Sequence, residues 1–192
     1  MPDEHCWLTT DRLGVRRFRT TDLDWLSSLY ADPDVTRFLG GTKTEAQVRS
    51  MLTTRILDYY YVNPGLGMWM TLERASGAPV GFHLINNIQG ESIIQIGFGL
   101  ARPAWGRGFA TEMASALLRY AFVDLDLDSV AGMASLANVA SQHVLQKIGL
   151  YRRGERTFPH PAYSAQGPLA WFERTAADWK AENPDGRQSL TP

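Results

Sequence analysis

The sequence has one cysteine, no long apolar run and almost no net charge, and each shortage excludes a class of protein. The lone Cys6 cannot form a disulfide within the chain. No stretch approaches the roughly 20 apolar residues of a membrane-spanning helix, and the acidic start lacks the apolar run of a signal peptide. A formal net charge of -1 provides no overall positive field for a nucleic acid. We therefore expect a cytoplasmic protein with no membrane or nucleic-acid partner.

The composition is that of an ordinary globular chain. Hydrophobic residues make up 44% and charged residues 20% of the 192 residues, which excludes disorder of the whole chain. This length fits one domain with a substantial core. We expect that domain to span residues 8–180 and residues 181–192 to form a flexible tail. No cluster of His, Cys and carboxylates has the spacing of metal ligands, so no metal site is predicted.

Strand-like and helical patterns alternate along the chain, which is typical of an α/β or α+β domain. Alternation and turn signals predict strands at 13–18, 68–72, 80–85, 93–100, 130–136, 152–157 and 169–174. Capping residues and apolar spacing predict helices after Thr21 or Asp22, from Thr44 to Tyr60, after Ala110, and from Asn138 to Ile148.

The predicted strand 93–100 has two unlike faces. One face carries Ile94, Ile96, Phe98 and Leu100, and the other carries Gln95, Gly97 and Gly99. Glycine weakens a strand unless something must approach its backbone closely. The glycine face therefore indicates a ligand that lies along this strand.

A glycine-rich turn, Trp105-Gly106-Arg107-Gly108-Phe109-Ala110, joins this strand to the next helix. The first N–H groups of a helix lack partners and lie at the positive end of its dipole, so small residues there let a phosphate approach. A tight strand-to-helix connection without a ligand would have the same pattern. The turn lacks the Gly-Lys-Ser/Thr of a P-loop and the glycine spacing of a dinucleotide fingerprint.

An ordered set of short motifs resembles the GNAT superfamily of N-acetyltransferases, and most of all its branch of ribosomal-protein-alanine N-acetyltransferases. The motifs run in order from residue 8 to about residue 180. They are Leu8-Thr9-Thr10-Asp11-Arg12-Leu13 with Arg16, Asp32-Pro33-Asp34-Val35, Phe38-Leu39-Gly40-Gly41, Ile96-Gly97-Phe98, Trp105 to Glu112, Asn138-Val139-Ala140-Ser141, Leu145 to Leu150 and Asp178-Trp179.

The resemblance implies an α+β fold, with a mixed, mostly antiparallel sheet that splays open after the strand of Gln95 and is flanked by helices. It implies acetyl-CoA as cofactor and coenzyme A as product, with pantetheine along the strand and pyrophosphate on the turn. A homodimer is an open alternative, since dimers are common in this family. The residues implied to bind the cofactor are Phe98, Gly99, Leu100, Trp105, Gly106, Arg107, Gly108, Phe109, Ala110, Thr111 and Asn138.

The resemblance also implies two catalytic positions. The tyrosine that serves many relatives as general acid is Leu145 here, and Ser141 is the expected general acid for the leaving thiolate, because the resembling branch uses a serine at this position. Gln95 occupies the place where the branch often has a glutamate base, and a carboxamide cannot accept a proton at neutral pH. Other candidates for the base are His83, His160, Tyr163 and Glu112, of which His83 is typical of packing and Glu112 of helix stabilisation.

We expect direct transfer of an acetyl group to a primary amine. Without a strong base, an α-amine is favoured, because neutralising it at pH 7 costs about 1 kcal/mol against about 4–5 kcal/mol for a lysine side chain. The acceptor is then a protein N-terminus or a small-molecule amine. Acidic residues in the acceptor cleft would instead favour an antibiotic or polyamine, and a non-catalytic acyl-CoA-binding module is the alternative class. Tyr59-Tyr60-Tyr61 could line the acceptor site, although core packing is favoured.

Overall fold

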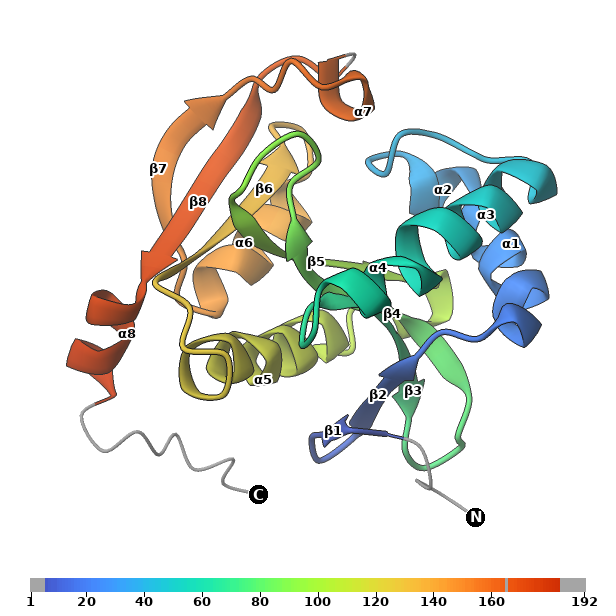
Figure 1. The fold of residues 1–192 in the computed structure, drawn as a ribbon, viewed down its shortest axis with the longest axis horizontal. Coiled ribbons are helices and arrows are strands. Elements are labelled where there is room, and N and C mark those ends of the chain that lie inside the picture. The colour runs from blue at the N-terminus through green and yellow to red at the C-terminus, as the bar shows by residue number, and fades with distance from the viewer. Residues whose placement is uncertain (1–5, 165, 184–192) are drawn as a thin grey trace.

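Eight strands form one sheet (Figure 1) in the computed structural model, which describes residues 6–164 and 166–183. Their order across the sheet is β1-β2-β3-β4-β5-β6-β8-β7. Only β5 and β6 pair in parallel, which confirms the expected mixed, mostly antiparallel sheet. The strands are β1 (Leu8–Thr9), β2 (Leu13–Arg17), β3 (Gly67–Glu73), β4 (Pro79–Asn87), β5 (Ile94–Leu100), β6 (Ser129–Ser135), β7 (Tyr151–Arg156) and β8 (Leu169–Thr175).

The helices confirm the predicted helical segments and add short ones. Thr44 caps α3 by accepting from Gln47 N–H. The helical chain then continues into a π-helical segment, η2. No helix in the described part of the chain is both long enough and apolar enough to span a membrane. The helices are η1 (Thr20–Asp22), α1 (Leu23–Ala31), α2 (Pro33–Thr36), α3 (Glu45–Met51), η2 (Leu52–Leu57), α4 (Tyr59–Val62), η3 (Arg102–Ala104), α5 (Phe109–Val123), α6 (Val139–Lys147), α7 (Pro161–Ser164) and α8 (Ala176–Glu182).

The last helix lies at the expected end of the domain. Helix α8 begins before residue 180 and continues to Glu182. Trp179 on this helix is 4% exposed and packs its ring 5.8 Å from that of Phe122 on α5. Burial of this large ring against α5 explains why the segment is ordered. The rest of the predicted tail, residues 184–192, lies outside the described residues.

The sheet divides between β5 and β6. Gln95–Ala131 is the one register pair between these two strands, both of which lie wholly in the described part of the chain. The two strands run in the same direction, and beyond this pair their carboxyl-terminal parts have no register partners in each other. Figure 1 shows α1, α2 and α3 on one side of the molecule and the β7–β8 arm on the other, with α7 at the top of the view between them. The splay predicted after the Gln95 strand is therefore confirmed.

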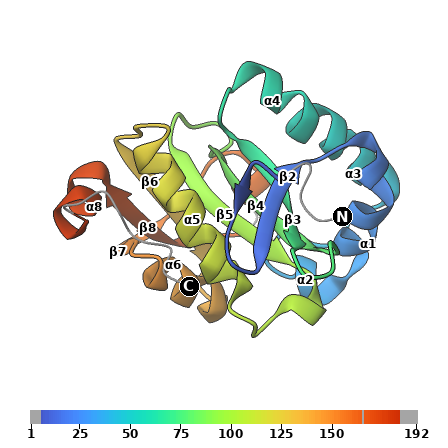
Figure 2. The same ribbon diagram turned by 90° about the horizontal axis from the view of Figure 1, so that it is seen from below.

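Helices cover the sheet on both faces. Helix α5 packs along β2, β4, β5 and β6, as Figure 2 shows from below. On the opposite face Tyr30 of α1 stacks on Phe82 of β4, with 6.3 Å between ring centroids and 6° between planes. Both faces of the central strands are thus buried, which positions β5 between the two helical layers.

The glycine face of β5 is occupied by neighbouring side chains. Phe82 and Leu84 stand opposite Gly99 and Gly97 on β4. A Cβ atom at Gly99 would meet the Phe82 ring at 2.6 Å, and one at Gly97 would meet Leu84 at 3.0 Å. Cross-strand packing therefore requires these glycines, while Gly97 also lines the cavity beside β5, so the ligand along this strand stays a prediction.

His83 of β4 contacts the first turn of α5 from the sheet beneath it. Its Nδ1 lies 2.7 Å from Thr71 Oγ1, and its Nε2 lies 3.4 Å from the Ala110 carbonyl oxygen. Because that carbonyl can only accept, Nε2 carries the proton and Nδ1 accepts from the hydroxyl. Complete burial lowers the pKa of His83 to about 4, so the ring is neutral.

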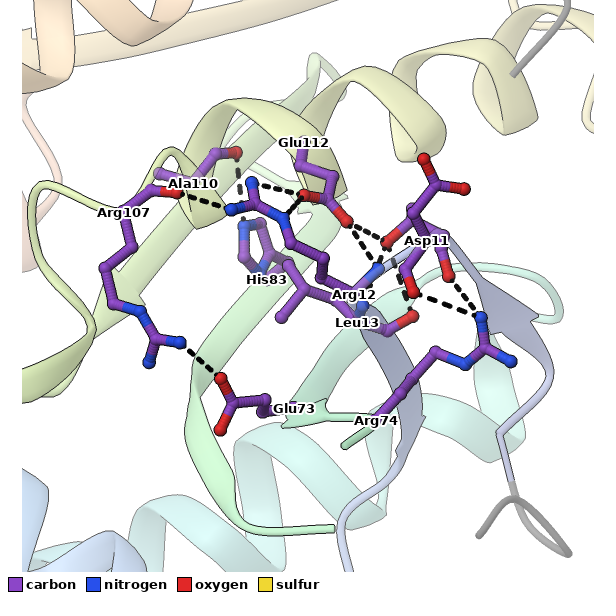
Figure 3. Close-up of polar contacts among 10 residues, drawn as sticks. Asp11, Arg12, Leu13, Glu73, Arg74, His83, Arg107, Ala110 and Glu112 are labelled. Carbon is purple, nitrogen blue, oxygen red and sulfur yellow. Dashed lines mark hydrogen bonds and ion pairs between the residues drawn. The ribbon is translucent and has the colours of Figure 1, made fainter. Parts of the chain in front are cut away.

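Glu112 and Arg12 fix the same helix from the side, as Figure 3 shows. The Glu112 carboxylate accepts from the Thr10 hydroxyl at 2.6 Å, from Arg12 N–H at 3.0 Å and from Arg12 Nε at 2.7 Å. Burial raises the pKa of Glu112, but the hydrogen bonds from Thr10 and Arg12 outweigh it and hold the pKa below its ordinary value. Arg12 also donates to the Arg107 carbonyl at 3.0 Å, so one side chain joins the β1–β2 turn to the glycine-rich turn.

Replacing this carboxylate should destabilise the fold in a pH-dependent way. The pKa of Glu112 is depressed in the folded state, so its contribution is present above the unfolded pKa of about 4.3 and is lost as the pH falls through the folded pKa. Glu112→Gln should lower the free energy of unfolding by about 1–3 kcal/mol near pH 7 and by less near pH 3, measured by urea denaturation.

Glu45→Gln is the matched control. Glu45 pairs with Arg49 on an exposed helix face, where such pairs contribute about 0.3–0.5 kcal/mol. Equal losses for the two variants, or a loss at Glu112 that does not depend on pH, would contradict the assignment.

Candidate functional site

A cavity of about 510 Å³ lies where β5 and β6 separate. Its walls come from β4, β5 and β6, from the start of α6, from α1 to η2 on one side, and from the segment around α7 on the other. This volume lies in the range of small-molecule sites. The lining residues used below are Tyr30, Phe38, Lys43, Met51, Arg55, Asn86, Gln89, Gln95, Phe98, Asn138, Ser141, Leu145 and Tyr163.

The edge of β5 provides backbone groups to this cavity. Beyond Gln95 the strand has no register partner in β6, although each non-proline residue carries an N–H and a C=O group that need partners. Phe98 lines the cavity, and the Leu100 carbonyl already accepts from the Trp105 indole N–H at 2.7 Å. An extended ligand with amide groups could pair with the free part of this edge.

Gln95 stands at the base of the separation. Its side chain is 9% exposed, and its Nε2 donates to Asn86 Oδ1 at 3.1 Å. This bond fixes the carboxamide, because Asn86 lies directly opposite on β4. The Gln95 carbonyl oxygen remains an acceptor in the cavity wall, suited to hold an N–H group and unsuited to remove a proton.

Asn138 and Ser141 reach the cavity from α6. Asn138 Oδ1 accepts from Ser141 N–H at 3.1 Å, which confirms Asn138 as the N-cap. Ser141 lines the cavity, and no protein group in residues 6–164 and 166–183 forms a hydrogen bond with its hydroxyl. Leu145, one turn further, is buried against the bare backbone of Gly132 and can transfer no proton.

The glycine-rich turn lies at the other end of β5. Gly106 and Gly108 have positive φ angles of 69° and 78°, and Gly108 is the N-cap of α5. The N–H groups of Phe109, Ala110 and Thr111 belong to the first helical turn and therefore have no intrahelical acceptor. Arg107 pairs with Glu73, and its guanidinium lies 4.3 Å from the Phe109 ring centroid. The turn thus presents donors to an anion, while part of its charge is neutralised within the protein.

The other candidates for a base are brought to different places. His83 and Glu112 are engaged in fixing α5 and do not line the cavity. His160 Nδ1 accepts from Ala162 N–H at 3.2 Å beside α7. Tyr163 lines the cavity, and its hydroxyl accepts from Gln89 N–H at 3.4 Å, which ties α7 to the β4–β5 turn.

The charges around the cavity are all of one sign. Among its described lining residues there is no Asp, Glu or His, and the charged ones are Lys43 and Arg55. Its polar uncharged lining is mainly carboxamide and hydroxyl groups. The acidic lining that would favour a polyamine or an antibiotic is therefore not what the structure shows. The described part of the chain also holds no group of three His, Cys, Asp or Glu side chains suited to a metal ion.

Tyr30, Lys43 and Arg55 were missed by the sequence analysis, and the tyrosine run was not the acceptor wall. Tyr60 is buried, with its hydroxyl bonded to the Met68 carbonyl, and Tyr59 bonds Asn87 at 2.7 Å. These contacts confirm packing for both. The four-residue spacing of Met51 and Arg55 could have predicted that both lie on one helix face, where they now line the cavity.

Comparison with known proteins agrees with this geometry. The family model of the acetyltransferase (GNAT) domain matches residues 12–151. The uncharacterized protein YkkB of Bacillus subtilis (strain 168) is 30% identical over 75% of this chain and 84% of that protein. The uncharacterized N-acetyltransferase p20 of Bacillus licheniformis is 26% identical over 77% of this chain and 83% of its own.

Solved structures show the same fold. The structure of AAC(6')-Ib in complex with ribostamycin and coenzyme A has a TM-score of 0.74 at 18% identity and covers 91% of this chain and 99% of that one. The narrower likeness is weaker: YdaF of Bacillus subtilis, provisionally named a ribosomal N-acetyltransferase, is 27% identical over 46% of this chain and 48% of its own. The family match spans most of the sheet and both ends of β5, and this chain therefore belongs to the GNAT family of acetyl-CoA-dependent N-acetyltransferases.

Proposed function

We propose that this chain acetylates a weakly basic primary amine, namely a protein N-terminal α-amine or the α-amine of a small molecule. The observation that carries this proposal is the cavity wall, whose described residues include no Asp, Glu or His. A site without a base requires an acceptor that is partly neutral by itself. An α-amine meets this requirement, because its ordinary pKa is near 8, whereas a lysine side chain has a pKa near 10.4.

The residues of β5 and α5 suit the acetyl donor. The free edge of β5 next to Phe98 would hold the pantetheine amides, and the first-turn N–H groups of α5 with Gly106 and Gly108 would hold the pyrophosphate. Asn138 would add a side-chain amide at the same cleft. Acetyl-CoA supplies the activated thioester, and the chain supplies position and hydrogen bonds.

Gln95 would orient the acceptor. Its fixed carboxamide oxygen can accept one N–H of the neutral amine, which directs the nitrogen lone pair toward the thioester carbon. The C–N bond forms as the C–S bond breaks, and the proton that the amine loses passes to water. Ser141 would donate its hydroxyl proton to the leaving thiolate and recover a proton from solvent.

The pH profile with a panel of amines tests this proposal. With an α-amine acceptor, log kcat/KM should rise with unit slope and level off near pH 8, and with an ε-amine it should rise until about pH 10. The rise follows the acceptor, because the described cavity wall includes no Asp, Glu or His, and His83, with a pKa of about 4, is buried outside the wall. Thiol release measured with an amide-capped alanine peptide and with N-α-acetyl-lysine would show it.

Two other outcomes would contradict the proposal. A plateau that begins at the same pH, near 6–7, for both amines would reveal a base on the protein. Tight binding of acetyl-CoA without thiol release on any amine would favour the non-catalytic acyl-CoA-binding module.

Removal of the Ser141 hydroxyl should slow the chemical step. Ser141→Ala should lower kcat by about 10²-fold, the lower range for general acid catalysis, without changing acetyl-CoA affinity measured by calorimetry. Ser135→Ala is the matched control, because Ser135 also lines the cavity but its Oγ accepts from Ala137 N–H at 3.3 Å. Similar kcat values for the two variants would remove Ser141 from the mechanism.

A substitution that strains the glycine-rich turn should weaken acetyl-CoA binding. Gly106→Ala should raise the dissociation constant about five- to thirtyfold, because a left-handed conformation costs an alanine about 1–2 kcal/mol and the turn would shift its amides. Gly77→Ala introduces the same strain at an identical φ of 69° in the β3–β4 turn, with open space around it in both cases. Equal affinities for the two variants would show that the turn does not hold the donor.

A further inference from the structure

One wall of the cavity carries two cations that the acetyl donor and Gln95 do not use. Lys43 lies between α2 and α3, and Arg55 lies in the π-helical segment η2. Lys43 Nζ is 5.5 Å from the centroid of the Tyr30 ring, which places its charge on the buried aromatic floor of this wall. A cation at the edge of an apolar wall is a candidate for recognising an anionic group.

Neither cation has an anionic partner in the described structure. No carboxylate of residues 6–164 and 166–183 forms a salt bridge with Lys43 or Arg55. The nearby Arg49 differs, because it pairs with Glu45 at 2.6 Å. The arginines of the glycine-rich region also differ, since Arg12 and Arg107 are paired with Glu112 and Glu73. The positive charge of the cavity is therefore available to a ligand.

The rest of the same wall is apolar. Phe38 and Met51 line the cavity with no charge, and Gln95 lies on the strand between the two helical sides. An acceptor whose amine lies at Gln95 would extend across apolar surface toward Lys43 and Arg55. A second amine on that acceptor would be repelled by these cations, and no carboxylate in the wall would compensate it.

We infer that the acceptor carries a carboxylate close to its amine, and that Lys43 and Arg55 bind this carboxylate. The inference rests on the proposed acetyl transfer at Gln95 and identifies the class of acceptor for it. The carboxylate can belong to an acidic side chain near the N-terminus of a peptide. It can also be the free α-carboxylate of a small amino acid derivative. Polycationic amines are excluded as good acceptors by the same charges.

Matched peptides separate this charge effect from amine basicity. Ala-Glu-amide, Ala-Gln-amide and Ala-Lys-amide share the same N-terminal residue and differ in the charge of one side chain. The kcat/KM from thiol release should be about tenfold higher for the Glu peptide than for the Gln peptide, and lowest for the Lys peptide and spermidine. Higher salt should reduce the difference, because screening weakens charge attraction.

A second pair of acceptors identifies the source of the carboxylate. Ala-Gly with a free carboxylate and Ala-Gly-amide differ only at the C-terminal group. A preference for free Ala-Gly would indicate a small-molecule acceptor, and a preference confined to Ala-Glu-amide would indicate an acidic peptide N-terminus. Either result supports the recognition of a carboxylate.

Variants then assign the effect to the two cations. Lys43→Gln and Arg55→Gln should each lower the preference for Glu over Gln about three- to fivefold, and an unchanged urea denaturation midpoint would report a folded enzyme. Arg49→Gln is the matched control, because it removes the same charge from an exposed position of α3 that does not line the cavity. It should leave the preference intact.

The outcomes that overturn the inference differ from the one that overturns the proposed function. Thiol release with equal rates on the three peptides and on the Ala-Gly pair, a preference for the Lys peptide or spermidine, or an unchanged preference in both cavity variants would refute carboxylate recognition while acetyl transfer stands. No thiol release on any amine would refute acetyl transfer itself, and the inference with it.

Discussion

The site depends on the separation of two parallel strands inside a continuous sheet. A strand in the middle of a sheet normally pairs on both sides, but β5 meets β6 at the single pair Gln95–Ala131. The backbone beyond that pair needs other partners, and an extended ligand with amides can provide them. The same separation opens the cavity to both helical sides of the molecule, and in the proposed reaction donor and acceptor would meet at Gln95.

Two ionisable residues that are candidates for a base, His83 and Glu112, serve to hold α5 in place. His83 is buried and neutral beneath Ala110, and Glu112 is ionised beside Arg12. Each could pass for a catalytic base by residue type alone, but each has its hydrogen bonds committed to the start of the helix. These contacts position the N–H groups in the first turn of α5, next to the glycine-rich turn. Structural use of these groups is consistent with a cavity whose described lining includes no Asp, Glu or His.

The proposed acetyl transfer divides chemistry and recognition between the two ends of the cavity. At β5 and α6, the carboxamide of Gln95 and the hydroxyl of Ser141 are uncharged, so the reactivity of the amine would follow its own pKa. At α1 to η2, Lys43 and Arg55 lie on an apolar wall and would give the cavity a preference for a negatively charged group. Selection by basicity and selection by a carboxylate would then act on different parts of one acceptor.

Local patterns in the sequence determined the main strands, the caps at Thr44 and Asn138, and the glycine-rich turn, because each depends on neighbouring residues. The ordered motifs also indicated the family and the splay after Gln95. Only the tertiary structure decided that β8 lies between β6 and β7, since pairing of distant strands leaves no local signal. It also decided which polar residues are available, because His83 and Glu112 find their partners across the fold. The absence of carboxylates from the cavity wall is likewise a property of several elements together, and no single segment of the sequence contains it.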